Sequence, residues 1–221
     1  MKFIYIIQMN ESENFNIPKI IMQTSVHKQP EYIINIIKNK CPGWDYVHFT
    51  DDEIIKYFQE NPIDELPNII DKFKSFSKGQ HKADLFRYYF LYLNGGIFLD
   101  SDAIFEVNIN KIIENYHNVF IRSFMKSTGF FNGFIATYKK CPIIYDSLKN
   151  AYNTENSTLK RDYFYFCKDL FKSYETHKPE NVKIYNETLN ANRQIGFILD
   201  SDNNKLLSHH FHFKKIPNMD I

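Results

Sequence analysis

The chain alternates between short, continuously apolar runs and longer segments whose apolar residues recur every three or four positions. Short apolar runs bounded by turn residues are typical of buried strands, whereas the wider spacing is typical of helices with one buried face. An order in which strands and helices alternate indicates an α/β domain. We therefore expect a mixed central sheet flanked by helices.

The pattern places these elements along the whole chain. Strands are expected at residues 3–7, 19–24, 44–49, 97–99, 119–124, 132–138, 195–199 and 206–213, and residues 103–107 should continue extended. Helices are expected at residues 31–38, 51–59, 78–93, 142–152 and 158–173, with Thr50 as the N-cap of the second. Residues 214–221 are expected to form a mobile tail.

Two carboxylates follow one of the buried strands. The helix over residues 78–93 should end at Asn94-Gly95-Gly96, since Asn and Gly accept the backbone geometry that ends a helix. Ile97-Phe98-Leu99 is the next strand, and Asp100-Ser101-Asp102 comes directly after it. Open α/β sheets bind ligands at the carboxyl ends of their strands, and Mg²⁺ and Mn²⁺ prefer carboxylate and phosphate oxygens. The motif therefore predicts a cation and diphosphate site.

A second D-x-D pair shows that the motif alone is weak evidence. Asp200 and Asp202 have the same spacing, but Asn203-Asn204-Lys205 follows them, which is typical of a hairpin turn. Such a pair arises by chance roughly once in a chain of this composition. The context of Asp100 therefore carries the prediction, and we expect Asp200 and Asp202 to lie in a turn.

Composition narrows the possible partners. The 221 residues suit one domain, and 43% hydrophobic residues suffice for a sizeable core. The formal net charge of +1 gives no global field for nucleic acid or an anionic membrane, so we expect no nucleic-acid partner. The strongest local bias, four Lys and one His in residues 72–82, is interpreted as a solvated loop and helix start.

The remaining features favour a cytoplasmic protein. Three widely spaced cysteines, Cys41, Cys141 and Cys167, fit a reducing compartment better than a disulfide framework or a zinc site. No apolar run approaches the roughly 18 residues that span a bilayer. The N-terminal apolar segment is too short for a signal peptide. We expect membrane contact only by recruitment.

Several segments together resemble a known family. The stretch from Lys82 to Asp102, KADLFRYYFLYLNGGIFLDSD, is similar to the signature of glycosyltransferase family 32, whose members carry a sugar-binding region with a DXD motif. Residues 17–24 resemble the first strand of that family, although Met22 stands where His is common, and residues 41–53 resemble its second unit. The resemblance covers residues 17–107 and is thin after residue 110. The family includes yeast mannosyltransferases, capsular polysaccharide transferases and, more distantly, clostridial glucosylating toxins.

The resemblance implies a GT-A fold, in which a Rossmann-like sheet binds a nucleotide diphosphate sugar. Residues 17–107 would form the nucleotide-sugar-binding part and residues 108–213 the part that faces the acceptor and completes the metal site. Asp84 and Arg87 would contact the donor sugar. Their i,i+3 spacing puts them on one helix face, where the alternative is a surface salt bridge.

The other implied contacts are assigned residue by residue. Asp100 and Asp102 would bind the metal, with His210 and then His212 as further ligands, since alternate residues of a strand share a face. Those nearest the nucleotide or its diphosphate would be Gln23, Thr24, Ser101 and Lys214. The alternatives are backbone packing for Thr24 and a solvated basic tail for Lys214. Asn132 would lie near the acceptor. Trp44 could stack on a base, but burial in the core is the better interpretation.

We therefore expect a metal-dependent, retaining glycosyltransferase with Mn²⁺ or Mg²⁺ as cofactor. It would move a hexose from a UDP-sugar, slightly favoured over a GDP-sugar, to a glycan, glycolipid or protein. The alternatives are a non-catalytic sugar-nucleotide or glycan-binding module, a toxin-like effector that glycosylates protein, and a haloacid-dehalogenase-like phosphatase. The last is disfavoured because its D-x-D normally lies near the N-terminus.

Overall fold

A computed structural model describes residues 15–124, 128–190 and 195–210. Its strands are β1 Ile20–Thr24, β2 Asp45–Phe49, β3 Gly96–Leu99, β4 Ala103–Phe105, β5 Asn118–Arg122, β6 Phe130–Thr137, β7 Val182–Leu189, β8 Ile195–Leu199 and β9 Lys205–His210. Its helices are α1 Glu31–Lys40, α2 Asp51–Glu60, α3 Ile69–Ser75, α4 Gly79–Asn94, α5 Asn110–Ile113, α6 Pro142–Asn153, α7 Asn156–Arg161 and α8 Tyr165–His177.

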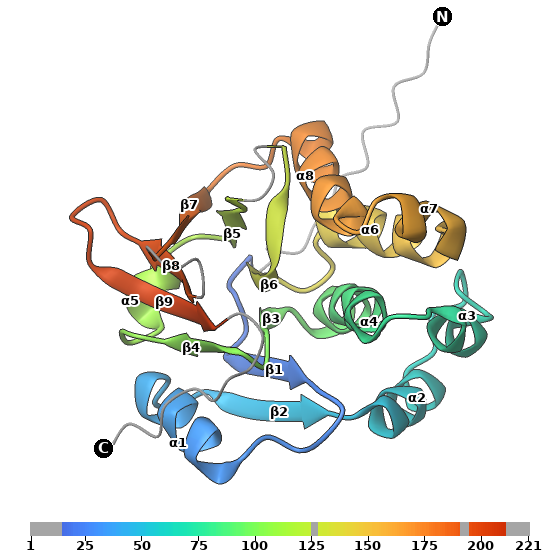
Figure 1. The fold of residues 1–221 in the computed structure, drawn as a ribbon, viewed down its shortest axis with the longest axis horizontal. Helices are drawn as coiled ribbons and strands as arrows, with labels where there is room; N and C mark the ends of the chain where they lie inside the picture. The colour runs from blue at the N-terminus through green and yellow to red at the C-terminus, as the bar shows by residue number, and fades with distance from the viewer. Residues whose placement is uncertain (1–14, 125–127, 191–194, 211–221) are drawn as a thin grey trace, which may run out of the picture.

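The strands form one mixed sheet in the order β2-β1-β3-β6-β5-β7-β8-β9-β4. β1 runs parallel to β2 and β3, whereas β3 pairs with β6 in antiparallel register. Only the turn at residues 100–102 separates β3 from β4, although the two lie far apart in this order. The sheet must therefore curl so that its β9–β4 end returns to the carboxyl end of β3, as Figure 1 shows.

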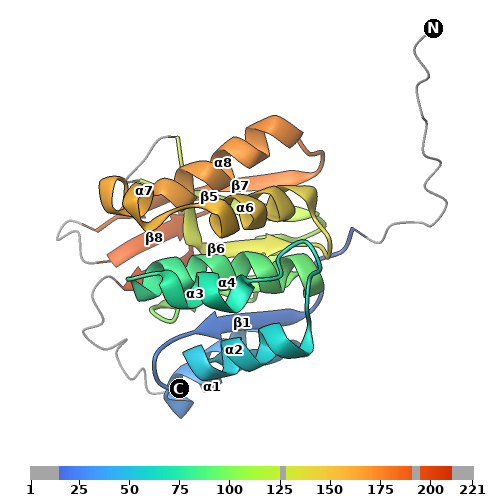
Figure 2. The same ribbon diagram turned by 90° about the vertical axis from the view of Figure 1, so that its right-hand side faces the viewer.

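Helices cover both faces of the sheet. Figure 1 shows α2, α4, α6 and α8 on one side and α1 and α5 on the other, and Figure 2 shows the larger layer from the front. The central strands alternate between two apolar clusters: Phe98 faces the cluster of the larger layer, while Ile97 and Leu99 face the one that includes α1. This period-two division explains why β3 is apolar at every position.

Two local features shape this part of the chain: a close approach of β3 to β1 and the cap of α2. Gly96 has φ +97°, and a Cβ there would lie 2.7 Å from the carbonyl oxygen of Ile20 on β1, so only glycine fits at this close approach. At the start of α2, Thr50 is the N-cap, as expected, and its backbone N–H donates to the Glu53 carboxylate at 2.9 Å in a capping box.

The expected α/β architecture is confirmed, with several differences in detail. The single helix expected at residues 158–173 is wrong: α7 ends at Arg161 and α8 begins at Tyr165. Part of the lysine-rich segment expected as a loop is the helix α3, and β7 was not anticipated. Asn132 and Gly133 lie inside β6 and do not open it.

The other expectations concern the second D-x-D pair, membrane-spanning helices and the two ends of the chain. Asp200 and Asp202 lie in the predicted turn, where the Asp200 carboxylate accepts from the backbone N–H of Asp202 and Asn204 at 2.9 and 2.8 Å. Within the described residues, no helix is long and apolar enough to cross a membrane. The N-terminal strand at residues 3–7 and the tail at residues 214–221 fall outside the described residues.

Candidate active site at the carboxyl end of β3

The Asp100-Ser101-Asp102 turn joins the central strand β3 to β4. Two glutamine side chains hold its backbone: Gln23 Nε2 donates to the Asp100 carbonyl at 3.0 Å, and Gln29 Nε2 donates to the Ser101 carbonyl at 2.9 Å. Gln23 is fully buried, and its Oε1 accepts from Tyr46 Oη at 2.8 Å. The amide of Gln23 therefore positions the turn.

Gly133 on β6 supports the Asp100 carboxylate. The backbone N–H of Asp100 donates to the Gly133 carbonyl at 2.8 Å. A Cβ at Gly133 would lie 2.5 Å from Asp100 Oδ2 and still closer to the ring of Phe131. Only glycine leaves room for the carboxylate, which explains the glycine inside this buried strand.

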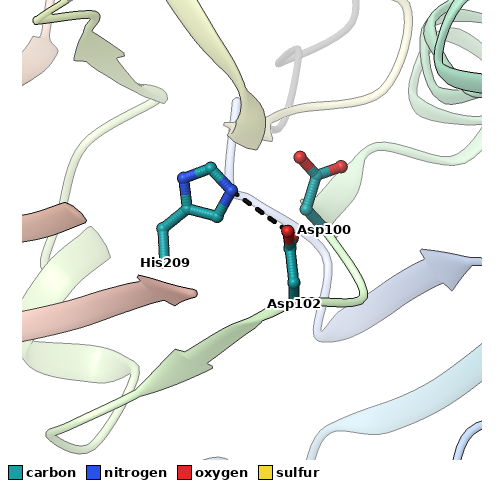
Figure 3. A group of neighbouring side chains, drawn as sticks. All are labelled: Asp100, Asp102 and His209. Carbon is teal, nitrogen blue, oxygen red and sulfur yellow. Dashed lines mark ion pairs between the residues drawn. The ribbon is translucent and has the colours of Figure 1, made fainter. Parts of the chain in front are cut away.

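The structure brings His209, and not His210, to the two carboxylates. One ligand atom from each of Asp100, Asp102 and His209 lies within 4.8 Å of the others. Figure 3 shows the three side chains converging, with His209 Nε2 3.4 Å from Asp102 Oδ2. His210 follows on the strand, so its side chain is on the opposite face, and its backbone N–H donates to the Asp102 carbonyl. The expectation that His210 joins this group is wrong, and His212 falls outside the described residues.

The sequence pattern of β9 does not reveal which face points inward. Leu206 and Leu207 are both buried, so the strand lacks the alternation that would assign its histidines to a face. The register decides instead: β9 pairs with β4 in antiparallel register, with His209 opposite Ala103, next to Asp102. That pairing depends on the curl of the sheet.

Glu187 on β7 is a part of the site that the sequence analysis missed. Its Oε1 lies 3.4 Å from His209 Nδ1, and its side chain is 1% exposed. The Phe131 ring packs against the imidazole, with centroids 4.5 Å apart. Burial lowers the pKa of His209, but the carboxylates of Asp102 and Glu187 outweigh it and raise the pKa to about 10. Two carboxylates therefore orient the ring from its two nitrogens.

Arg87 links the predicted donor residues to the DXD turn. Its guanidinium lies 3.5 Å from Asp84 Oδ1 and 3.4 Å from Asp100 Oδ1, and it is 4% exposed. The Asp84–Arg87 pair is therefore buried, unlike the surface salt bridge of the alternative interpretation. The guanidinium also covers the Phe98 ring at 3.9 Å, and burial, which lowers its pKa, is outweighed by Asp84 and Asp100, which raise it. Arg87 thus stays charged between two carboxylates.

Asn132 completes this buried network. Its Nδ2 donates to Asp84 Oδ1 at 2.9 Å and to Tyr88 Oη at 2.8 Å. Its backbone carbonyl accepts from the Arg87 guanidinium. Asn132 Oδ1 is buried, and in the part of the chain described it has no hydrogen-bond partner. Because buried polar atoms are normally paired, this oxygen is a candidate acceptor for a ligand hydroxyl.

The charge on Asp100 depends on these neighbours. Burial raises the pKa of Asp100 to about 6, Arg87 opposes the rise, and Asp102 adds to it. The side chain is still 29% exposed, so the carboxylate is accessible. A partly exposed carboxylate with a raised pKa beside a second one is an arrangement that a divalent cation stabilises.

The other predicted residues lie around this centre. Thr24 ends β1 and Ser101 lies in the turn, and both are half-buried. Trp44 is 8% exposed, which confirms its burial. Lys214 lies outside the described residues.

The donor set fits a divalent oxygen-binding cation. An ion bound about 2.1 Å from each oxygen holds its ligands roughly 3–4 Å apart, so small side-chain rotations would bring the three groups around one ion. The two carboxylates suit Mn²⁺, and His209 would join them as a ligand once the bound cation displaces its proton. The His209–Glu187 contact corresponds to the carboxylate that commonly orients a metal-bound histidine.

A family model agrees with this geometry. The model described as "Glycosyltransferase sugar-binding region containing DXD motif" matches residues 27–119, which include Asp84, Arg87, Asp100 and Asp102. Residues 27–119 are therefore similar to a glycosyltransferase sugar-binding region. The resemblance predicted from the sequence is thereby confirmed. His209 and Glu187, which complete the site, lie beyond this sugar-binding region.

Curated relatives from the fission yeast Schizosaccharomyces pombe extend the likeness. The chain is 25% identical over 182 residues to "Inositol phosphoceramide mannosyltransferase 1", covering 75% of this chain and 55% of the relative. It is 29% identical over 104 residues to "Inositol phosphoceramide mannosyltransferase 3", covering 45% and 28%. The chain spans about half, or less, of the length of these relatives.

A solved structure supports the fold. The structure titled "PaToxG Glycosyltransferase" superposes with a TM-score of 0.50 at 19% identity, covering 73% of this chain and 70% of that one. The predicted GT-A fold is confirmed by this similarity and by the mixed sheet flanked by helices.

Proposed function

We propose that this protein is a metal-dependent glycosyltransferase that uses a nucleotide diphosphate sugar. The observation that carries the proposal is the convergence of Asp100, Asp102 and His209 beside the buried Asp84–Arg87–Asn132 network. One group suits a cation and a diphosphate, and the other offers acceptors and donors to sugar hydroxyls. The sugar-binding region and the two mannosyltransferase relatives support a hexose, for which mannose is the first candidate.

Asp100, Asp102 and His209 would hold Mn²⁺ or Mg²⁺, which would offset the negative charge that develops on the leaving diphosphate. Arg87 keeps Asp100 in place from the other side. Asn132 Oδ1 and Asp84 would accept hydrogen bonds from sugar hydroxyls. The Arg87–Asp100 contact joins the residues proposed for the cation to those proposed for the sugar.

In the proposed reaction, the bond between the anomeric carbon and the diphosphate oxygen breaks. A bond forms between that carbon and the acceptor oxygen. The acceptor hydroxyl proton passes to the departing diphosphate, whose oxygens are the nearest base in a front-face reaction. This route retains the anomeric configuration. UDP-sugars remain slightly favoured as donors, and a cytoplasmic location stays a prediction.

A donor screen tests the proposal. UDP- and GDP-sugars with MnCl₂ should raise the melting temperature and be slowly hydrolysed, and EDTA should reverse both effects. Hydrolysis of aryl phosphates without a sugar donor would instead indicate a phosphatase. Tight donor binding without hydrolysis or transfer would indicate a binding module.

Glu187→Gln should weaken Mn²⁺ binding by about 10- to 100-fold, because the amide orients the His209 ring less firmly than the carboxylate. Calorimetric titration of MnCl₂ measures the change. The matched control is Glu106→Gln: Glu106 also accepts a hydrogen bond from a β9 side chain, that of Ser208, but does not contact His209. Equal losses in both variants would contradict the assigned role of Glu187.

A further inference from the structure

Tyr163 is an exposed aromatic residue beside the proposed active site. It lies between α7 and α8, where the sequence pattern predicted a continuous helix. It is 42% exposed, and the large hydrophobic residues exposed to this degree in the described chain are Tyr163 and Val26. A single exposed ring is ordinary on a protein surface, so a binding role for Tyr163 depends on the groups that surround it.

The break is rigidly built. Asp162 Oδ1 accepts from the backbone N–H of Phe164 at 3.2 Å, and Asp162 Oδ2 pairs with Lys168 at 2.5 Å. His81 on α4 contacts the Tyr163 carbonyl through Nε2 at 3.3 Å, and the two rings lie 5.4 Å apart. The position of Tyr163 is therefore fixed by contacts from both α8 and α4.

Those contacts place Tyr163 next to the buried network that contains Asp84. His81 is one helical turn before Asp84 on α4. At the start of α8, the Phe166 carbonyl accepts from Tyr88 Oη, which also accepts from Asn132 Nδ2. Partial burial, Asp84 and Asp100 raise the pKa of Tyr163, which agrees with a hydroxyl close to these carboxylates.

Three basic residues lie near Tyr163, one of them over its ring and two just before it in the chain. Lys78 Nζ lies over the Tyr163 ring, 4.8 Å from its centroid. Lys160 and Arg161 are exposed at the end of α7, three and two residues before Tyr163, respectively. In the described residues, Lys78, Lys160 and Arg161 form no salt bridge, whereas Lys82 pairs with Asp51. Unpaired cations beside an exposed ring suit an anionic ligand.

We propose that Tyr163 and Lys78 form the acceptor-binding rim of the active site, and that the acceptor presents a saccharide or polyol ring next to an anionic group. The C–H face of such a ring would pack on Tyr163, and the anionic group would lie near Lys78 and Arg161. The ring would then stand at the edge of the donor-sugar site. This inference rests on the proposed function, which supplies the donor side.

Saturation-transfer NMR with three probes tests the rim: mannose 6-phosphate, methyl α-D-mannopyranoside and inorganic phosphate. Tyr163→Ala should weaken the binding of mannose 6-phosphate by about tenfold. Lys78→Gln should weaken it by roughly twofold to fivefold, as expected for an exposed ion pair, without affecting the neutral glycoside. Both variants should keep the donor-induced rise in melting temperature.

A second lysine–tyrosine pair provides matched controls. Lys149 Nζ lies over the Tyr145 ring at 4.4 Å on α6, but Lys149 also pairs with Asp146. Tyr145→Ala and Lys149→Gln should leave binding of all three probes unchanged.

Three outcomes separate the inference from the proposed function. The proposed rim would be overturned if Tyr163→Ala bound mannose 6-phosphate as tightly as the wild type does. It would also be overturned if the wild type showed no binding up to tens of millimolar ligand. The rim would also be overturned if inorganic phosphate bound as tightly as mannose 6-phosphate, because the site would then be only a cationic surface. If no nucleotide sugar binds but the saccharide still binds through Tyr163, the glycosyltransferase assignment fails and the saccharide-binding rim is supported.

Discussion

Asp102→Asn is expected to reduce sugar transfer at least about a hundredfold, in line with the loss of one group that stabilises developing charge. The substitution keeps the shape of the side chain but removes the charge that faces His209 and the proposed cation. The fold should remain, because Asp102 bonds to the β9 backbone through its main-chain carbonyl. The measurement is the initial rate of transfer, or of donor hydrolysis, as a function of MnCl₂ concentration.

The second D-x-D pair supplies the control for this variant. Asp202→Asn makes the same chemical change in an exposed turn, and it should leave transfer and the response to MnCl₂ unchanged. Wild-type rates in Asp102→Asn would refute the metal assignment. A similar loss in Asp202→Asn would show that the effect is not specific to the site.

Arg87→Met should lower the free energy of unfolding by about 3–5 kcal/mol, the usual cost of leaving a buried charge unpaired. Asp84 and Asp100 both lose their cation, and the carbonyl of Asn132 loses a donor. For a chain of this length, the melting temperature should fall by roughly 10 °C. Donor binding should be lost as well, so stability is measured by denaturant unfolding without donor.

A double variant separates stranded charge from lost packing. If the unpaired carboxylates cause the instability, Asp84→Asn added to Arg87→Met should recover part of the loss, about 1–2 kcal/mol. The amide oxygen can still accept from Asn132 Nδ2. Further destabilisation in the double variant would mean that packing of the guanidinium on Phe98 dominates.

Local residue patterns predicted much of the fold and the part of the site formed by α4 and the turn after β3. The helix that holds Asp84 and Arg87, the Asn-Gly-Gly stop and the apolar strand before Asp100 all follow from residue spacing and turn chemistry. The helix break at Asp162 did not follow, because the apolar spacing continues through it. The loop is held by contacts longer than one helical turn: Lys168 pairs with Asp162, and His81 contacts the Tyr163 carbonyl.

Local patterns did not identify which C-terminal histidine lies beside the paired carboxylates. A C-terminal histidine was expected beside Asp100 and Asp102, and His210 was predicted because it shares a strand face with His212. The burial of both Leu206 and Leu207 shows that β9 lacks the alternation that would have assigned its histidines to a face. Glu187, 22 residues before His209, carried no local signal. Gln23 was predicted near a nucleotide, yet its amide is used on the backbone of the DXD turn.

The sequence by itself therefore determined most of the elements, but not α3, α5, β7 or the break between α7 and α8. It also determined which strand ends in the paired carboxylates, since these features depend on contacts between near neighbours in the chain. Only the tertiary structure decided that β9 returns beside β4, which brings His209 and Glu187 to Asp102. It also decided that Asp84, Arg87 and Asn132 share one buried network. The physical reason is that strand register and sheet curvature depend on pairing between distant segments, which residue patterns within one strand do not encode.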